Sequence, residues 1–149
     1  MNRFIFRGPF ALVLAILAVP VLSAPAQTGK RPHVSRGAAQ FVNANDFVGE
    51  GNATHLGHYK EIGSAQFSPT ADPTVLRVDG WAKYTAANGD QLSARISGNL
   101  NGVTGVIIAT VTYVGGTGRF SDASGTATLL ARVLPGGSID VAVKGTIDY

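Results

Sequence analysis

The stretch "VLRVDGWAKYTA", residues 75–86, decides the fold class because its apolar side chains recur at every second position. The alternating side chains between them are polar, except for Trp81. The recurring set is Leu76, Val78, Gly80, Ala82 and Tyr84. A period of two places successive side chains on opposite faces of a strand, whereas an amphipathic helix needs a period near 3.6. The stretch is therefore predicted to be a half-buried β-strand.

Two further segments repeat this alternation, and each follows a turn signal. "QLSARISGNL", residues 91–100, comes shortly after Asn88-Gly89, a pair suited to the positive φ angles of a tight hairpin turn. "SIDVAVKGTIDY", residues 138–149, comes directly after Pro135-Gly136-Gly137. Short turns between alternating segments predict neighbouring antiparallel strands.

The segment "VTGVIIATVTYV", residues 103–114, differs because both of its faces are apolar and β-branched. Such a strand is typical of a sheet covered on both sides, or of a contact between subunits. A homo-oligomer is therefore one of the two interpretations.

The fold class follows from these strands together with the absence of a convincing amphipathic helical pattern after the N-terminal region. We predict an all-β domain at residues 41–149, built as an antiparallel barrel of about seven or eight strands. A barrel is favoured because each strand has one apolar face and closure removes exposed sheet edges. A β-sandwich is the alternative. The chain has no cysteine, so a single domain must be held together by packing alone.

The N-terminus has the layout of a secretory signal peptide. Arg3 and Arg7 precede an apolar run at residues 10–22, and small residues follow up to Ala26. The run is shorter than the roughly 20 residues that a membrane-spanning helix needs. We therefore predict a cleaved signal peptide at residues 1–26, no transmembrane segment after processing, and a secreted or periplasmic protein.

Residues 27–40, "QTGKRPHVSRGAAQ", are rich in glycine, alanine and polar residues and show no apolar periodicity. They are predicted to be a flexible lead-in. The charge distribution argues against a nucleic-acid partner. The whole chain carries a net charge of +3, but from Phe41 onward seven basic residues face nine acidic ones, spread singly, so no basic surface is predicted.

His55 and His58 lie three positions apart in "GNATHLGHYK", residues 51–60. On an extended strand an odd separation sends side chains to opposite faces, so the two would share a metal ion only if the chain bends at Gly57. The default interpretation is a kinked strand with one buried and one exposed imidazole, and a metal site is the weak alternative. Asn52 begins a glycosylation sequon, which matters only in a eukaryotic secretory route.

The glycine-rich stretch "YVGGTGRFSDASGTATLLA", residues 113–131, resembles a hairpin of the allene oxide cyclase and dirigent barrel superfamily. Residues 51–59 and 84–98 also resemble small exported bacterial proteins with that barrel. The resemblance covers residues 45–149 and implies eight strands, an oligomer in the plant members, and a lumen for an apolar ligand. The plant cyclases isomerise an unstable fatty-acid epoxide in that lumen, and dirigent proteins steer the coupling of phenoxy radicals.

The predicted inner faces carry no carboxylate, histidine or amine, although an enzyme needs a positioned acid, base or donor. They comprise Leu76, Val78, Tyr84, Leu92, Ile96, Val141, Val143, Ile147 and Tyr149. We therefore predict an exported, non-catalytic barrel that acts as a structural, interaction or small-apolar-ligand module, without a cofactor. The candidate ligand-binding residues are Tyr84, Ile96, Val141 and Tyr149. The alternative, implied by the resemblance, is an isomerase or cyclase for a lipid-derived or phenolic substrate.

Overall fold

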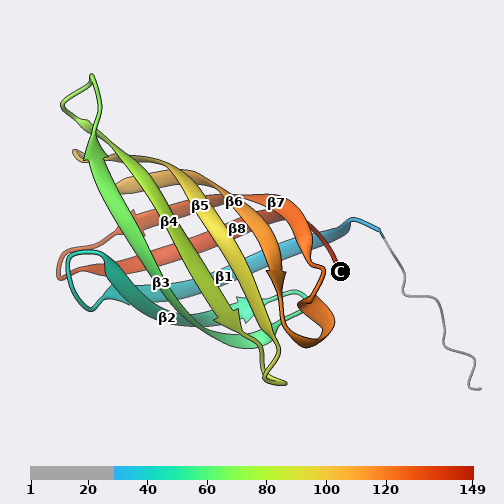
Figure 1. Ribbon diagram of the computed structural model, residues 1–149. Coiled ribbons are helices and arrows are strands. Elements are labelled where there is room, and N and C mark those ends of the chain that lie inside the picture. Colours follow the sequence, from blue (N-terminus) through green and yellow to red (C-terminus); the bar gives the residue numbers. More distant parts are fainter. Residues whose placement is uncertain (1–28) are drawn as a thin grey trace, which may run out of the picture.

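The computed structural model describes residues 29–149; the predicted signal peptide, residues 1–26, lies outside them, as do residues 27 and 28. The described chain forms a closed barrel of eight antiparallel strands in sequence order (Figure 1). The strands are β1 (Arg31–Phe41), β2 (Asp46–Ala53), β3 (Gly57–Pro69), β4 (Val75–Thr85), β5 (Gln91–Asn101), β6 (Val106–Gly116), β7 (Ser124–Val133) and β8 (Ser138–Asp148). The prediction of an all-β antiparallel barrel is confirmed, and the sandwich alternative is not adopted.

Closure depends on β1, which pairs with β2 on one side and with β8 on the other. The β1–β8 ladder runs from Arg31 opposite Ile147 to Gln40 opposite Ser138. Each described strand is therefore hydrogen-bonded along both sides, which satisfies the backbone polar groups and removes open sheet edges.

The prediction of a flexible lead-in is wrong for residues 31–40, because they form most of β1. The buried positions of this strand include His33 and Ser35, and the partly buried Gly37 lies between them and Ala39. Because these inward residues are polar or small, the sequence shows no apolar alternation here. The strand is nevertheless held by hydrogen-bonded ladders on both sides. The barrel domain therefore begins by Arg31, about ten residues before the predicted boundary.

The strands predicted in the C-terminal half are confirmed as β4, β5 and β8, and the turn signals between strands are confirmed by positive φ angles. Gly89 has φ +90°, and Gly136 and Gly137 have φ +91° and +83°. The segment predicted at residues 103–114 starts later, at Val106. Its outward face is solvent-exposed in the single chain.

The barrel is closed at one end by the connection between β6 and β7. This connection contains a short 3-10 helix, η1 (Gly118–Phe120), and the Phe120 side chain is fully buried. Arg119 donates a hydrogen bond to the backbone carbonyl of His55 and lies 3.7 Å from the Asp90 carboxylate. The connection is thereby tied to the turns beside it. Within the part of the chain that the structure describes, no helix has the length and hydropathy required to cross a membrane.

Candidate functional site

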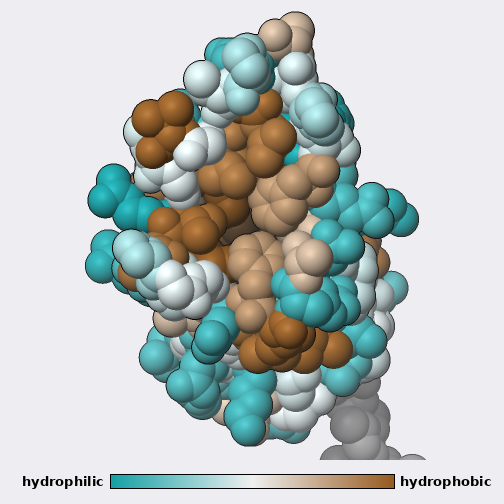
Figure 2. All heavy atoms as spheres, turned by 90° about the vertical axis from the view of Figure 1, so that its left-hand side faces the viewer, coloured by the Kyte–Doolittle hydropathy of each residue, from teal (hydrophilic) through white to brown (hydrophobic). Residues whose placement is uncertain are grey.

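The lumen opens at the end of the barrel opposite Phe120, where the turns between β1 and β2, β3 and β4, β5 and β6, and β7 and β8 lie. Figure 2 looks onto this end and shows hydrophobic side chains around a central hollow. Its cavity volume is about 60 Å³, within about 530 Å³ of non-atom space that includes open solvent at the mouth. Its lining residues are Ala39, Phe41, Phe47, Glu61, Ala65, Phe67, Val78, Tyr84, Ile96, Ile107, Leu129, Ala131, Ile139 and Val141.

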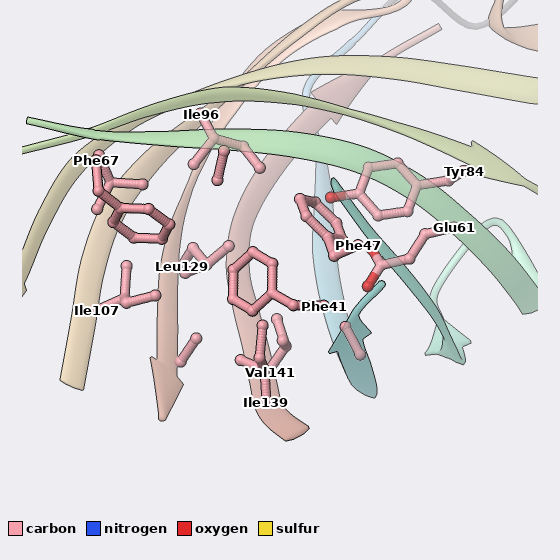
Figure 3. A pocket seen from close by; sticks show the side chains of 14 residues that line it. Phe41, Phe47, Glu61, Phe67, Tyr84, Ile96, Ile107, Leu129, Ile139 and Val141 are labelled. Carbon is pink, nitrogen blue, oxygen red and sulfur yellow. The ribbon is translucent and has the colours of Figure 1, made fainter. Parts of the chain in front are cut away.

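Three phenylalanines shape the outer part of this pocket. Phe41 at the end of β1 makes edge contacts with Phe47 and with Phe67, at ring-centroid distances of 6.2 and 6.0 Å. Ile107 of strand β6 and Leu129 of strand β7 also line the pocket (Figure 3). An apolar wall of this kind binds the hydrocarbon part of a ligand by removing it from water.

The inner part of the same pocket is polar, because Glu61 and Tyr84 line it. These two residues are direct cross-strand partners on β3 and β4. Figure 3 shows them at the end of the pocket away from Phe67 and Ile107. The Glu61 residue is only 7% exposed. The pocket therefore runs from an apolar mouth to a buried carboxyl group beside a phenol.

A smaller hollow continues beyond Glu61 and Tyr84 toward the closed end, and both residues line it as well. Its other polar residues include Ser35 and Tyr59, whose hydroxyl oxygens are 2.9 Å apart and share a hydrogen bond. The ring of Tyr59 contacts that of Tyr84 edge-on, with 5.4 Å between centroids. The lumen therefore holds a connected polar cluster behind its apolar mouth.

Two glycines on β2 make room for this cluster. Gly49 is paired with Glu61, and Gly51 with Tyr59. A Cβ atom at Gly49 would lie 2.6 Å from Glu61 Oε1, and one at Gly51 would lie 2.6 Å from the Tyr59 hydroxyl. Both distances are shorter than van der Waals contact, so the polar side chains occupy the space that the missing side chains leave.

Burial controls the protonation of these groups. It raises the pKa of Glu61 from 4.5 to about 7. It also raises the pKa of the hydroxyl groups of Tyr59 and Tyr84, which therefore stay protonated at neutral pH. Near pH 7 the Glu61 carboxyl is divided between its neutral and ionised forms, so it can donate or accept a hydrogen bond or a proton.

His33 is a second buried titratable group of the inner hollow, at 2% exposure. Burial lowers the pKa of His33 to about 4, and the charge of His55 contributes to this shift. A hydrogen bond with the backbone of Thr54 acts in the opposite direction and raises the pKa. The imidazole is therefore neutral at physiological pH. Its Nδ1 atom has no hydrogen-bond partner among the described residues.

The structure brings three of the four predicted lumen residues together. Tyr84, Ile96 and Val141 line the pocket at the mouth end. Tyr149 lies at the closed end instead, where its ring packs on Phe120 at 4.9 Å and beneath the guanidinium of Arg31 at 4.8 Å. That these residues bind a ligand stays a prediction.

The segment around His55 and His58 is a turn rather than the predicted kinked strand. His55 lies between β2 and β3 with φ +75°, and its Nε2 atom is 2.9 Å from the carbonyl oxygen of Pro32. His58 is exposed on β3, 3.9 Å from the Glu50 carboxylate. Across residues 29–149, no group of three or more histidine, cysteine or acidic side chains is placed to hold a metal ion.

The prediction that the lumen carries no carboxylate or histidine is wrong, because Glu61 and His33 are buried there. His33 lies in the segment predicted to be a flexible lead-in, and Glu61 lies one residue beyond the strand predicted within residues 51–60. A signal for Glu61 exists in the sequence, since Tyr59, Glu61 and Phe67 share one face of an alternating segment. The opposite face carries Lys60, Ser64 and Gln66, and its one large apolar residue, Ile62, is 51% exposed, so the alternation does assign Glu61 to the inner face.

Comparison with known proteins adds no family to this description. The chain matches no protein-family model, and no curated protein is significantly similar to it in sequence. Because a fold alone does not specify an activity, function has to be argued from the chemistry of the lumen.

The raised pKa of Glu61 predicts a pH-dependent stability. A carboxyl with a folded-state pKa near 7 and an unfolded pKa of 4.5 stabilises the fold fully below pH 4.5, and this contribution is lost as the pH rises through 7. Glu61→Gln mimics the neutral form. We expect its free energy of unfolding to match the wild type at about pH 4 and to exceed it by roughly 3 kcal/mol at about pH 8.

The measurement is chemical denaturation across this pH range, with Glu50→Gln as the matched control on the exposed face of β2. The control should follow the wild-type profile. The titration of His33 affects the wild type and both variants alike, so it cancels in the difference. Parallel profiles for the wild type and Glu61→Gln would contradict the assignment.

Proposed function

We propose that this protein binds a small, mainly apolar molecule with one hydrogen-bonding group inside its barrel lumen, as a secreted or periplasmic protein. The observation that carries the proposal is the open apolar pocket that ends at Glu61 and Tyr84. A barrel with a purely structural role gains nothing from such a hollow, since an unfilled core forfeits packing energy.

The pocket also suggests how the ligand is oriented. Its hydrocarbon part lies against Phe41, Phe67 and Leu129, where each Å² of apolar surface removed from water contributes about 25 cal/mol. Its polar group reaches Glu61, because an unpaired buried carboxyl is costly and a ligand hydroxyl, carbonyl or carboxyl satisfies it. The ligand class is therefore an elongated alcohol, ketone or carboxylic acid.

The binding proposal predicts that 1-octanol occupies the lumen. Leu129 and Leu130 form a matched pair on β7, because the first lines the pocket and the second is exposed on the outer face. We expect Leu129→Phe to weaken octanol binding at least about tenfold by filling the pocket, and Leu130→Phe to leave it unchanged. Isothermal titration calorimetry measures both.

A third variant, Glu61→Leu, tests the polar end of the same pocket. Loss of one hydrogen bond should lower the octanol affinity about fivefold, which corresponds to about 1 kcal/mol. Binding that is absent in the wild type, or equal in all variants, would refute lumen binding.

A second candidate function is an isomerase or cyclase for a lipid-derived or phenolic substrate. The observation that favours it is the pKa of Glu61 near 7, beside the protonated Tyr84 hydroxyl. A carboxylate removes a proton from a carbon next to a carbonyl group and the phenol stabilises the oxygen, after which the proton returns at another position. Such an isomerisation balances without a cofactor.

This activity predicts exchange of the α-protons of 2-octanone with D₂O, which NMR follows directly. The wild type should accelerate exchange, and Glu61→Gln should lose at least about a hundredfold of that acceleration because it cannot accept the proton. If the protein binds octanol but does not accelerate exchange, the carrier function stands and this proton-transfer chemistry is excluded for simple ketones.

The outer face of β6 and β7 supports a homo-oligomer, which we propose as the assembled state. Ile108 and Leu130 are paired across these strands and are 59% and 53% exposed. Neighbouring apolar side chains on one sheet face favour contact with a second copy.

Sedimentation velocity should show an oligomer for the wild type and a monomer for the Ile108→Lys, Leu130→Lys double variant. Val48→Lys on β2, which is also an exposed apolar position, is the matched control and should remain assembled. A monomeric wild type, or an oligomer that tolerates both lysines on β6 and β7, would contradict this interface.

A further inference from the structure

A second hollow lies on the outer surface of the barrel, over strands β3 to β6, and shares only Ile96 with the lining of the lumen pocket. Its volume is about 590 Å³. Trp81 on β4 lines it, with Ser64 of β3 and Arg95 of β5 as its direct cross-strand partners. The outward side chains of three neighbouring strands therefore meet at this indole.

Trp81 is the only tryptophan in the chain, and it is 47% exposed. A large aromatic ring left in water is informative when polar groups surround it. Here Ser64, Gln66 and Ser93 line the same hollow together with the exposed Val114, so polar and apolar side chains alternate around the indole. A ring face among hydroxyl and amide groups suits a ligand that has both apolar faces and many hydrogen-bonding groups.

The charges in the hollow favour an anion. Arg77 and Asp79 engage each other at 2.6 Å, and the Ser97 hydroxyl also donates to Asp79 at 2.8 Å. In contrast, no hydrogen bond or ion pair from the described residues engages the side chains of Lys83 or Arg95. Two unpaired cations therefore flank Trp81, while the nearby carboxylate is already satisfied.

We propose that this outer hollow binds an acidic saccharide, such as a uronic-acid unit of a polysaccharide. One face of a pyranose ring presents C–H groups that pack on the electron-rich face of the Trp81 indole. The sugar carboxylate pairs with Arg95 and Lys83, and the Arg95 guanidinium can bind it through two parallel hydrogen bonds, in a bidentate arrangement. The sugar hydroxyls reach the serine and glutamine side chains on neighbouring strands.

Two other anionic partners fit these residues less well. A lipid surface requires a contiguous apolar face, whereas the large exposed apolar side chains of this hollow, Trp81 and Val114, stand among serine, glutamine and charged side chains. A single-stranded nucleic acid requires several stacking rings along a continuous basic groove. The described residues 29–149 carry ten basic and nine acidic side chains, which is close to balance, and the hollow has one ring and two unpaired cations.

The test uses a short oligogalacturonate as the probe and its methyl ester as the matched neutral sugar. Because Trp81 is the sole tryptophan, its fluorescence reports this site directly. We expect the acid to shift the Trp81 emission and to bind about tenfold more tightly than the ester at low salt, with the preference falling as salt is added.

Calorimetry on variants then separates the contacts. Trp81→Ala should weaken binding of the oligogalacturonate about tenfold, and Arg95→Gln and Lys83→Gln should each reduce the preference over the ester. Lys144→Gln on β8, outside the hollow, should leave binding unchanged. All four changes are at partly or fully exposed positions, so circular dichroism should show an intact barrel.

Several results would overturn the proposal. They are an unchanged Trp81 emission, equal affinity for the acid and the ester, and full binding by Trp81→Ala. Tighter binding to a single-stranded oligonucleotide or to vesicles of anionic phospholipid would likewise refute a saccharide site. None of these outcomes depends on the lumen, so the lumen proposal is tested separately.

Discussion

The closure of the sheet by β1 is the constraint on which the rest of the structure depends. Because β1 pairs with both β2 and β8, each inward side chain of the eight strands shares one enclosed volume. Closure satisfies the backbone, but it leaves the lumen to be filled by side chains alone. Phe120 fills the volume at one end, and the other end stays open.

The chemistry of the lumen follows from what occupies its middle. Gly49 and Gly51 leave space on β2 that the carboxyl of Glu61 and the hydroxyl of Tyr59 occupy. Burial then raises the pKa of that carboxyl to about 7, so one group serves as donor or acceptor near neutral pH. An apolar mouth and a polar interior orient a ligand with its hydrocarbon part at the mouth and its polar group inside. For this reason we favour ligand binding over a structural role.

The sequence predicts the fold better than the site, for identifiable reasons. Residues 75–86, 91–100 and 138–149 alternate strongly because each has one apolar face, and they are strands as predicted. The strand at residues 31–41 has His33 at an inward position. This strand is therefore held in the barrel by its pairing with β2 and β8 and not by the hydrophobicity of its side chains. Alternation also gives the face of a residue but not its depth along the barrel, and so Tyr149 was placed in the lumen pocket.

The most direct test of lumen binding is native mass spectrometry of the protein purified gently from its natural host. We expect a complex whose mass exceeds that of the protein by the mass of one small molecule. Denaturing analysis should release an apolar compound with a hydroxyl, carbonyl or carboxyl group, and Leu129→Phe should carry less of it than Leu130→Phe. A wild-type protein recovered only at its unmodified mass would contradict ligand binding in the lumen.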